Sequence, residues 1–173
     1  MLTPYEIAVL RKQGHLDEAY SAAKHALATS SDNQNELLRL LGFIVCDQLK
    51  SLAGAASASF LAKLKDFSDL HIPESETMIY NSLLWNLRAF VVDEHKSDED
   101  ITHSMDTLFD LIRPMPIRRQ TDAFSAFVNA VLHHASAWGR LGEWALWCGF
   151  DGLQPKDFQP FITQDNKRLD VPC

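Results

Sequence analysis

Apolar residues recur at intervals of three and four along most of the chain, with polar residues between them. This is the period of an α-helix that buries one side, and no segment shows the strict alternation of a half-buried strand. The pattern therefore predicts an all-α fold of about seven or eight antiparallel helices. We expect the helices at about residues 4–13, 15–28, 34–49, 51–70, 74–92, 97–112, 121–138 and 141–148. The helix at 74–92 should bury Ile79, Leu83, Leu87 and Phe90, and the helix at 97–112 should bury Ile101, Met105, Leu108 and Ile112.

Capping residues mark several of the predicted helix starts. A side-chain oxygen just before a helix accepts a hydrogen bond from an amide that has no partner within the helix, and an acidic residue three positions later completes the pair. Three pairs have this spacing: Thr3 with Glu6, Asn33 with Glu36, and Ser97 with Asp100. Pro114 and Pro116 are expected to end the helix that Ser97 begins, because proline lacks an amide donor and disfavours helical geometry in the preceding residue.

The composition of the chain is that of a folded domain without a membrane span. The chain has 173 residues, 46% of them hydrophobic and 23% charged, which is typical of one folded domain. Its 16 Lys and Arg against 23 Asp and Glu give a net charge of −7, which argues against general nucleic-acid binding. Mean hydropathy is −0.14 and no long apolar run is present, so we expect no membrane span. We expect a helical domain over 1–150 and a partly ordered tail over 151–173.

The start of the chain and the cysteines point to a cytoplasmic location. The first residues lack the basic start and apolar stretch of a secretory signal. Cys46, Cys148 and Cys173 are an odd, widely spaced set, which is typical of free thiols in a reducing compartment.

The first predicted helix pair resembles a known repeat family. A turn at Gly14 is followed by His15-Leu16-Asp17-Glu18-Ala19, and then by the small residues Ala23 and Ala26. This segment resembles the tetratricopeptide repeat, best over residues 4–49. The resemblance implies a right-handed array of helical hairpins in which Gly14 makes the turn and the alanines let two helices approach closely.

The same resemblance implies a function. In this family the first helix of each pair lines a concave groove that holds a peptide or a helix of a partner protein. Backbone groups within helices are already bonded to one another, so such a groove recognises its partner through side chains. The polar and aromatic candidates for this role are Arg11, Lys12, Asn35, Arg39, Asn81, Trp85 and Arg88.

Signals of catalysis or of metal binding are weak. The chain has no glycine-rich phosphate loop, no Cys-x-x-Cys and no local nucleophile signature, so we expect neither an enzyme nor a cofactor. His95, Glu99 and His103 have the spacing of ligands on one helical face. However, Ser97 is the expected cap, which leaves His95 outside the helix, and Glu99 then belongs to the acidic first turn that the helix dipole favours. We therefore expect no metal site.

Two further clusters have both a structural and a functional interpretation. Arg113, Arg118 and Arg119 surround the proline turn and could bind an anion, although Arg113 is also where a helix favours a cation. The aromatic residues from Trp138 to Phe161 could close the end of the array or form an adhesive surface for a partner.

The sequence thus predicts a non-catalytic adaptor that binds another protein or a peptide. Two alternatives remain open at this stage. One is a small acidic regulator or inhibitor that binds an enzyme or a nucleic-acid-processing complex as a globular unit. The other is the N-terminal interaction segment of a larger protein.

Overall fold

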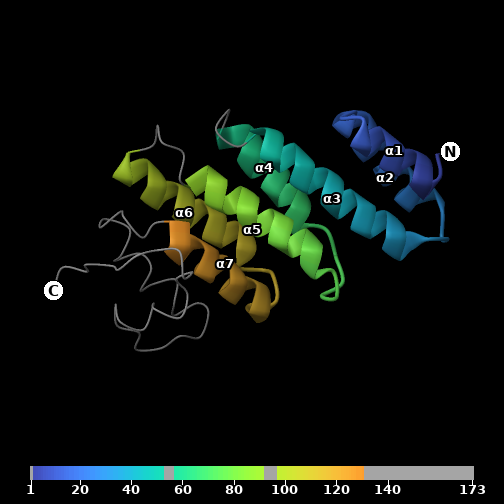
Figure 1. Cartoon of the computed structure of the whole chain (residues 1–173). Coiled ribbons are helices and arrows are strands. Elements are labelled where there is room, and N and C mark those ends of the chain that lie inside the picture. The colour runs from blue at the N-terminus through green and yellow to red at the C-terminus, as the bar shows by residue number, and fades with distance from the viewer. Residues whose placement is uncertain (1, 53–56, 92–96, 131–173) are drawn as a thin grey trace. The chain divides into compact units, whose positions relative to one another are not determined.

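A computed structural model describes residues 2–52, 57–91 and 97–130 (Figure 1), and within these ranges every regular element is a helix and none is a strand. The prediction of an all-α fold is confirmed for this part of the chain. The helices are α1 (Pro4–Lys12), α2 (Leu16–Thr29), α3 (Gln34–Leu52), α4 (Ser57–Ser68), α5 (Thr77–Val91), α6 (Asp98–Ile112) and α7 (Ile117–Ala130). The helix predicted at 141–148, the tail at 151–173 and the aromatic residues from Trp138 to Phe161 lie outside the described residues.

Two of the predicted caps are present. The hydroxyl of Thr3 accepts a hydrogen bond from the backbone amide of Glu6 at 3.3 Å, and the Glu6 carboxylate accepts one from the Thr3 amide at 2.7 Å. Ser97 and Asp100 form the same reciprocal pair at the start of α6. The third prediction differs, because Asn33 has a φ of 60° in the left-handed region rather than the extended backbone of a capping residue.

The turn between α1 and α2 depends on glycine. Gly14 has a φ of 85°, a backbone conformation that residues with a Cβ adopt only with strain. This confirms the predicted glycine turn. On the other side of it, Ala19, Ala23 and Ala26 are buried, so small side chains line the contact surface of α2.

Several predicted helix ends are wrong by a few residues. Helix α3 continues to Leu52, past the turn expected near residue 50, because the sequence there holds no residue that breaks a helix. Helix α5 begins at Thr77 rather than near residue 74, after a turn in which the Glu76 amide donates to the Pro73 carbonyl at 3.0 Å. Helix α7 begins directly after Pro116 rather than near residue 121.

The chain divides into two compact units, the first ending at Asn86. In the first unit α1 contacts α2 and α3, α2 contacts α3, and α3 contacts α4. Helix α3 is therefore the centre of this unit, and nine of its 19 residues are buried. The core contains Ile7 of α1, the alanines of α2 and five large apolar residues of α3: Leu37, Leu40, Leu41, Ile44 and Leu49.

The second unit, from Leu87 onward, contains the contact between α6 and α7. Helix α6 buries Ile101, Met105, Leu108 and Ile112, the four residues predicted from its apolar pattern. Phe109 meets Phe127 with ring centroids 5.1 Å apart and Phe124 with centroids 6.4 Å apart in an edge-to-face arrangement. These rings form the aromatic centre of the contact between the two helices.

Candidate binding surface

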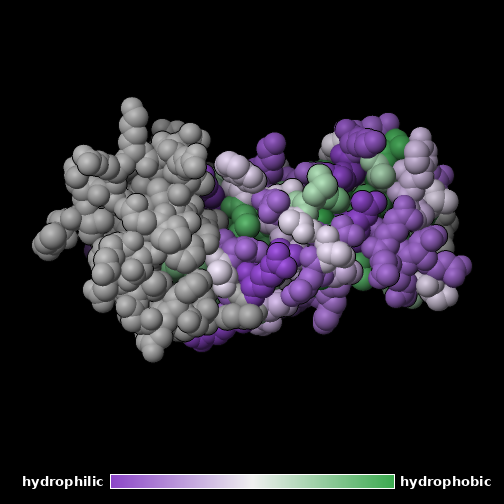
Figure 2. All heavy atoms as spheres, turned by 60° about the horizontal axis from the view of Figure 1, so that its bottom comes forward, coloured by the Kyte–Doolittle hydropathy of each residue, from purple (hydrophilic) through white to green (hydrophobic). Residues whose placement is uncertain are grey.

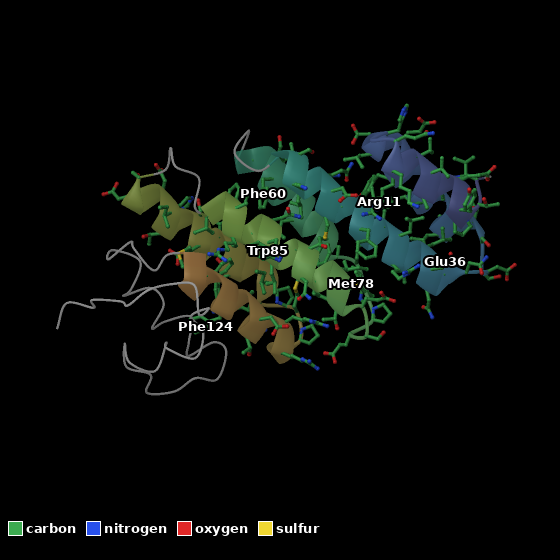
Figure 3. The ribbon with its side chains drawn as sticks, viewed as in Figure 1. Arg11, Glu36, Phe60, Met78, Trp85 and Phe124 are labelled. Atoms are coloured by element: carbon green, nitrogen blue, oxygen red, sulfur yellow. The ribbon has the colours of Figure 1, made fainter. Side chains whose placement is uncertain are left out.

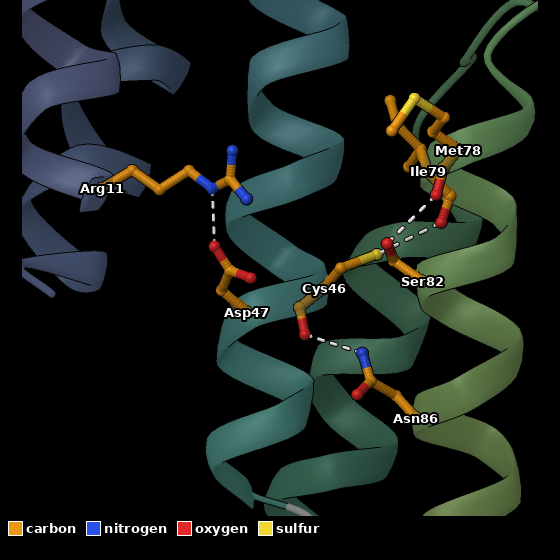
Figure 4. Close-up of polar contacts among 7 residues, drawn as sticks. All are labelled: Arg11, Cys46, Asp47, Met78, Ile79, Ser82 and Asn86. Carbon is orange, nitrogen blue, oxygen red and sulfur yellow. Dashed lines mark hydrogen bonds and ion pairs between the residues drawn. The ribbon is translucent and has the colours of Figure 1, made fainter.

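Helices α1, α3 and α5 lie side by side, with α3 in the middle (Figure 4). On the α1 side, the Nε of Arg11 donates a hydrogen bond to Oδ2 of Asp47 at 2.5 Å. The guanidinium carbon of Arg11 lies 4.8 Å from the centre of the Phe43 ring, which adds a cation–π contact. One arginine therefore ties α1 to two residues that are one turn apart on α3.

On the other side of α3, polar contacts fix α5. The Nδ2 of Asn86 donates to the backbone carbonyl of Cys46 at 2.7 Å, and the Cys46 thiol donates to the backbone carbonyl of Ile79 at 3.6 Å (Figure 4). The two helices come close at Gly42, where an added Cβ would lie 2.8 Å from Cδ1 of Ile72 and 3.0 Å from Cγ2 of Ile79. Glycine at this position thus permits the close approach.

A strip of α3 lies between these two sets of contacts. Asp47 points to α1 and Cys46 points to α5. In a helix the positions between these two directions are those of Glu36, Arg39, Phe43 and Lys50. Arg39 and Lys50 are exposed and Phe43 is half-buried. The strip therefore carries two cations, the carboxylate of Glu36 and one aromatic ring, and it lies between α1 and α5.

The neighbouring side of α5 carries exposed apolar residues. Hydrophilic residues cover most of the described surface that Figure 2 shows. Met78 and Trp85, in contrast, are 73% and 68% exposed. They are seven residues apart, so they lie on the same side of α5, and Figure 3 shows both side chains on this helix. Ser82 lies between them and donates to the Met78 carbonyl at 3.0 Å.

We define the three-helix face as six residues of these three helices that supply a cation or a large apolar side chain at the surface. It consists of Lys12 on α1, of Arg39, Phe43 and Lys50 on α3, and of Met78 and Trp85 on α5. All six residues belong to the first compact unit.

The structure places the predicted binding residues in three groups. Lys12, Arg39 and Trp85 lie in the three-helix face, and Asn35 and Asn81 are exposed beside it on α3 and α5. The side chain of Arg11 is only 27% exposed, because it bonds to Asp47 within the fold. Arg88 belongs to the second compact unit, so it lies outside the face.

Sequence reasoning missed three members of the face: Phe43, Lys50 and Met78. The signal for Met78 was present, since it precedes Trp85 by two helical turns. Phe43 and Lys50 could be assigned only once the neighbours of α3 were known, because an isolated helical pattern does not show which flank each neighbour covers.

Cys46 has the environment of an inert thiol. Burial raises the pKa of Cys46 to about 12, and the nearby Asp47 carboxylate adds to this increase while Arg11 opposes it. A thiolate is the reactive form of cysteine, so a raised pKa together with burial suppresses its chemistry.

This environment predicts slow labelling of Cys46. In a variant in which Cys148 and Cys173 are replaced by serine, we expect a thiol-specific disulfide reagent at pH 8 to react with Cys46 about a hundredfold more slowly in the folded protein than in urea. The release of the coloured thiol measures both rates. Equal rates in the two conditions would show that the thiol is accessible in the native state.

The other candidate sites gain no support. Within residues 2–52, 57–91 and 97–130, no group of three His, Cys, Asp or Glu side chains could hold a metal ion. His95 lies outside the described residues. Arg119 is buried and donates to Asp122 at 3.2 Å, whereas Arg113 and Arg118 are exposed. The predicted arginine cluster is thus not a uniform basic patch, because one of its members faces the interior.

Two further findings concern helices that could span a membrane and similarity to known proteins. None of the described helices combines the length and the apolar character that crossing a membrane requires. No protein-family model, no curated protein and no solved structure matches the chain.

Proposed function

We propose that the protein is a non-catalytic interaction adaptor that binds a peptide or a helix of another protein on the three-helix face. The observation that carries this proposal is the exposure of Met78 and Trp85 on one side of α5. The opposite side of the same helix buries Ile79, Leu83, Leu87 and Phe90, as its apolar pattern predicts. The helix therefore has a complete core-facing side and, in addition, two large apolar side chains in contact with solvent.

The composition of the face supports a protein partner. Tryptophan, arginine and methionine are enriched at the centres of protein interfaces, where a few large side chains contribute most of the binding free energy. Trp85 and Met78 supply apolar contact area, while the guanidinium of Arg39 can donate two hydrogen bonds to a carboxylate or to carbonyl oxygens. The helical backbone has its own hydrogen bonds, so these side chains would select the partner.

The tetratricopeptide-like arrangement is part of the same proposal. In that architecture the first helix of each pair lies on the concave side, and in this chain α1, α3 and α5 are the first helices of their pairs. The glycine turn at Gly14 and the buried alanines of α2 support it for the first pair. The proposal extends the arrangement to the pairs that follow.

Affinity capture with the whole chain tests this function. We expect the double variant Met78→Ser/Trp85→Ser to lose the partner proteins that the unmodified chain captures from cells that produce it, with unchanged helix content by circular dichroism. The control is Ala28→Ser/Ala58→Ser, which alters two exposed apolar side chains on α2 and α4. An identical set of captured proteins with both double variants would place the binding surface elsewhere.

A further inference from the structure

The cations of the three-helix face lack internal partners. Within the described residues, no carboxylate lies within ion-pair distance of Lys12, Arg39 or Lys50. The lysines of α4 differ, because Lys63 pairs with Asp66 and Lys65 pairs with Asp69, each at 3.0 Å. The α1 and α3 cations are thus uncompensated, in a chain with a net charge of −7.

Few carboxylates could offset them from the same helices. The segments 4–12, 34–52 and 77–86 contain only three acidic residues: Glu6, Glu36 and Asp47. Glu6 is engaged in the cap of α1, and Asp47 is paired with Arg11. Glu36 alone remains against three cations, so the face has a local positive charge that opposes the charge of the whole chain.

Resting on the proposed function, we infer that the partner segment is an acidic peptide with at least one large apolar side chain. Its carboxylates would pair with Lys12, Arg39 and Lys50, and its apolar side chain would pack on Met78 and Trp85. Charge complementarity of this kind gives specificity and accelerates association. The same cations repel basic segments, which disfavours those as partners.

Nucleic acid is the competing occupant, because its phosphates would meet the same cations and its bases could stack on Trp85. The net charge of −7 opposes it, since a polyanion several nucleotides long interacts with the field of the whole chain. A short acidic segment bound at the face interacts mainly with the local cations, because the Debye length at physiological salt is about 8 Å. The peptide is therefore the occupant that the charges favour.

Selection from a phage-displayed library of random short peptides tests the inference with the whole chain as bait. We expect the enriched sequences to combine Asp or Glu with Trp, Phe or Leu. Synthesis of the most enriched peptide and of its analogue, with each acidic residue changed to its amide, gives the affinities by fluorescence anisotropy. The amide analogue should bind at least tenfold more weakly.

Charge reversal locates the bound peptide. The variant Lys12→Glu/Arg39→Glu should weaken binding tenfold or more, and Lys24→Glu/Lys65→Glu, which changes the net charge equally through α2 and α4, should leave it within twofold. The neutral variant Lys12→Gln/Arg39→Gln should also lose affinity, which separates the loss of cations from any effect of new carboxylates on folding.

The other outcomes overturn the inference in distinguishable ways. Enrichment of neutral or basic peptides that need Met78 and Trp85 would disprove the acidic partner while the proposed function stands. The absence of any enriched peptide would contradict both. Binding of a single-stranded oligonucleotide that depends on Arg39 and Lys12, without peptide enrichment, would assign the face to nucleic acid.

Discussion

Replacement of Phe109 by alanine is expected to lower the free energy of unfolding of the α6–α7 contact by about 3–5 kcal/mol, the usual cost of truncating a buried phenylalanine. The side chain is buried and its ring contacts both Phe124 and Phe127. Its removal leaves a cavity between the two helices, and it eliminates two aromatic contacts.

Amide hydrogen exchange in α6 and α7 measures this effect, since it reports the opening of these helices directly. We expect exchange of their slowest amides to become faster by a hundredfold or more, which corresponds to about 2.8 kcal/mol. The neighbouring exposed Asp110 provides the control, because Asp110→Ala should change the free energy by less than about 0.5 kcal/mol. A similar acceleration in both variants would contradict the aromatic centre described above.

Replacement of Gly42 by leucine should destabilise the first unit by about 3 kcal/mol, because overpacking a tight helix contact costs about 1–3 kcal/mol and sometimes more. A Cβ added at Gly42 would lie 2.8 Å from Ile72 and 3.0 Å from Ile79, and leucine has three further carbon atoms beyond its Cβ. Ile72 and Ile79 would have to move, and with them the start of α5.

Gly42→Ala is the matched variant. Its single methyl group meets the ends of flexible side chains, and alanine gains about 1 kcal/mol of helix propensity over glycine, so we expect a net change below about 1 kcal/mol. Urea titration measures both variants. Leucine at this position should also accelerate labelling of Cys46, which is one turn away and bonds to Ile79. A leucine variant as stable as the alanine variant would show that α3 and α5 are not in close contact here.

The sequence predicted the buried sides of the helices well. The four inward residues expected on α5, Ile79, Leu83, Leu87 and Phe90, are all buried, since hydrophobic periodicity reports burial directly. The caps of α1 and α6 were also predictable, because a capping pair needs only residues three positions apart. Features that depend only on residues close together in the sequence could thus be predicted from the sequence.

Predictions that depended on neighbouring helices were less complete. Arg11 is of a residue type that often binds partners. However, its guanidinium donates a hydrogen bond to Asp47, which is 36 residues away in the sequence and lies within the same fold. The predicted helix boundary near residue 50 is wrong, because α3 continues past Lys50 to Leu52. The pairing of Arg11 and the position of Lys50 between α1 and α5 both depend on which helices pack against α3, and the helical period alone does not specify this.

The hydrogen bond from Asn86 has a consequence for how the chain tolerates substitution. Its acceptor is the backbone carbonyl of residue 46, so the bond does not depend on which side chain occupies that position. Apolar surfaces of two helices can slide along one another at little cost, whereas a buried amide bonded to one specific carbonyl is satisfied at a single axial offset. Asn86 thus fixes the axial register of α5 relative to α3. This buried bond therefore sets the spacing between Lys50 on α3 and Trp85 on α5. Substitutions at the surface would change which partner the chain binds, but they would leave the distance between these two positions unchanged.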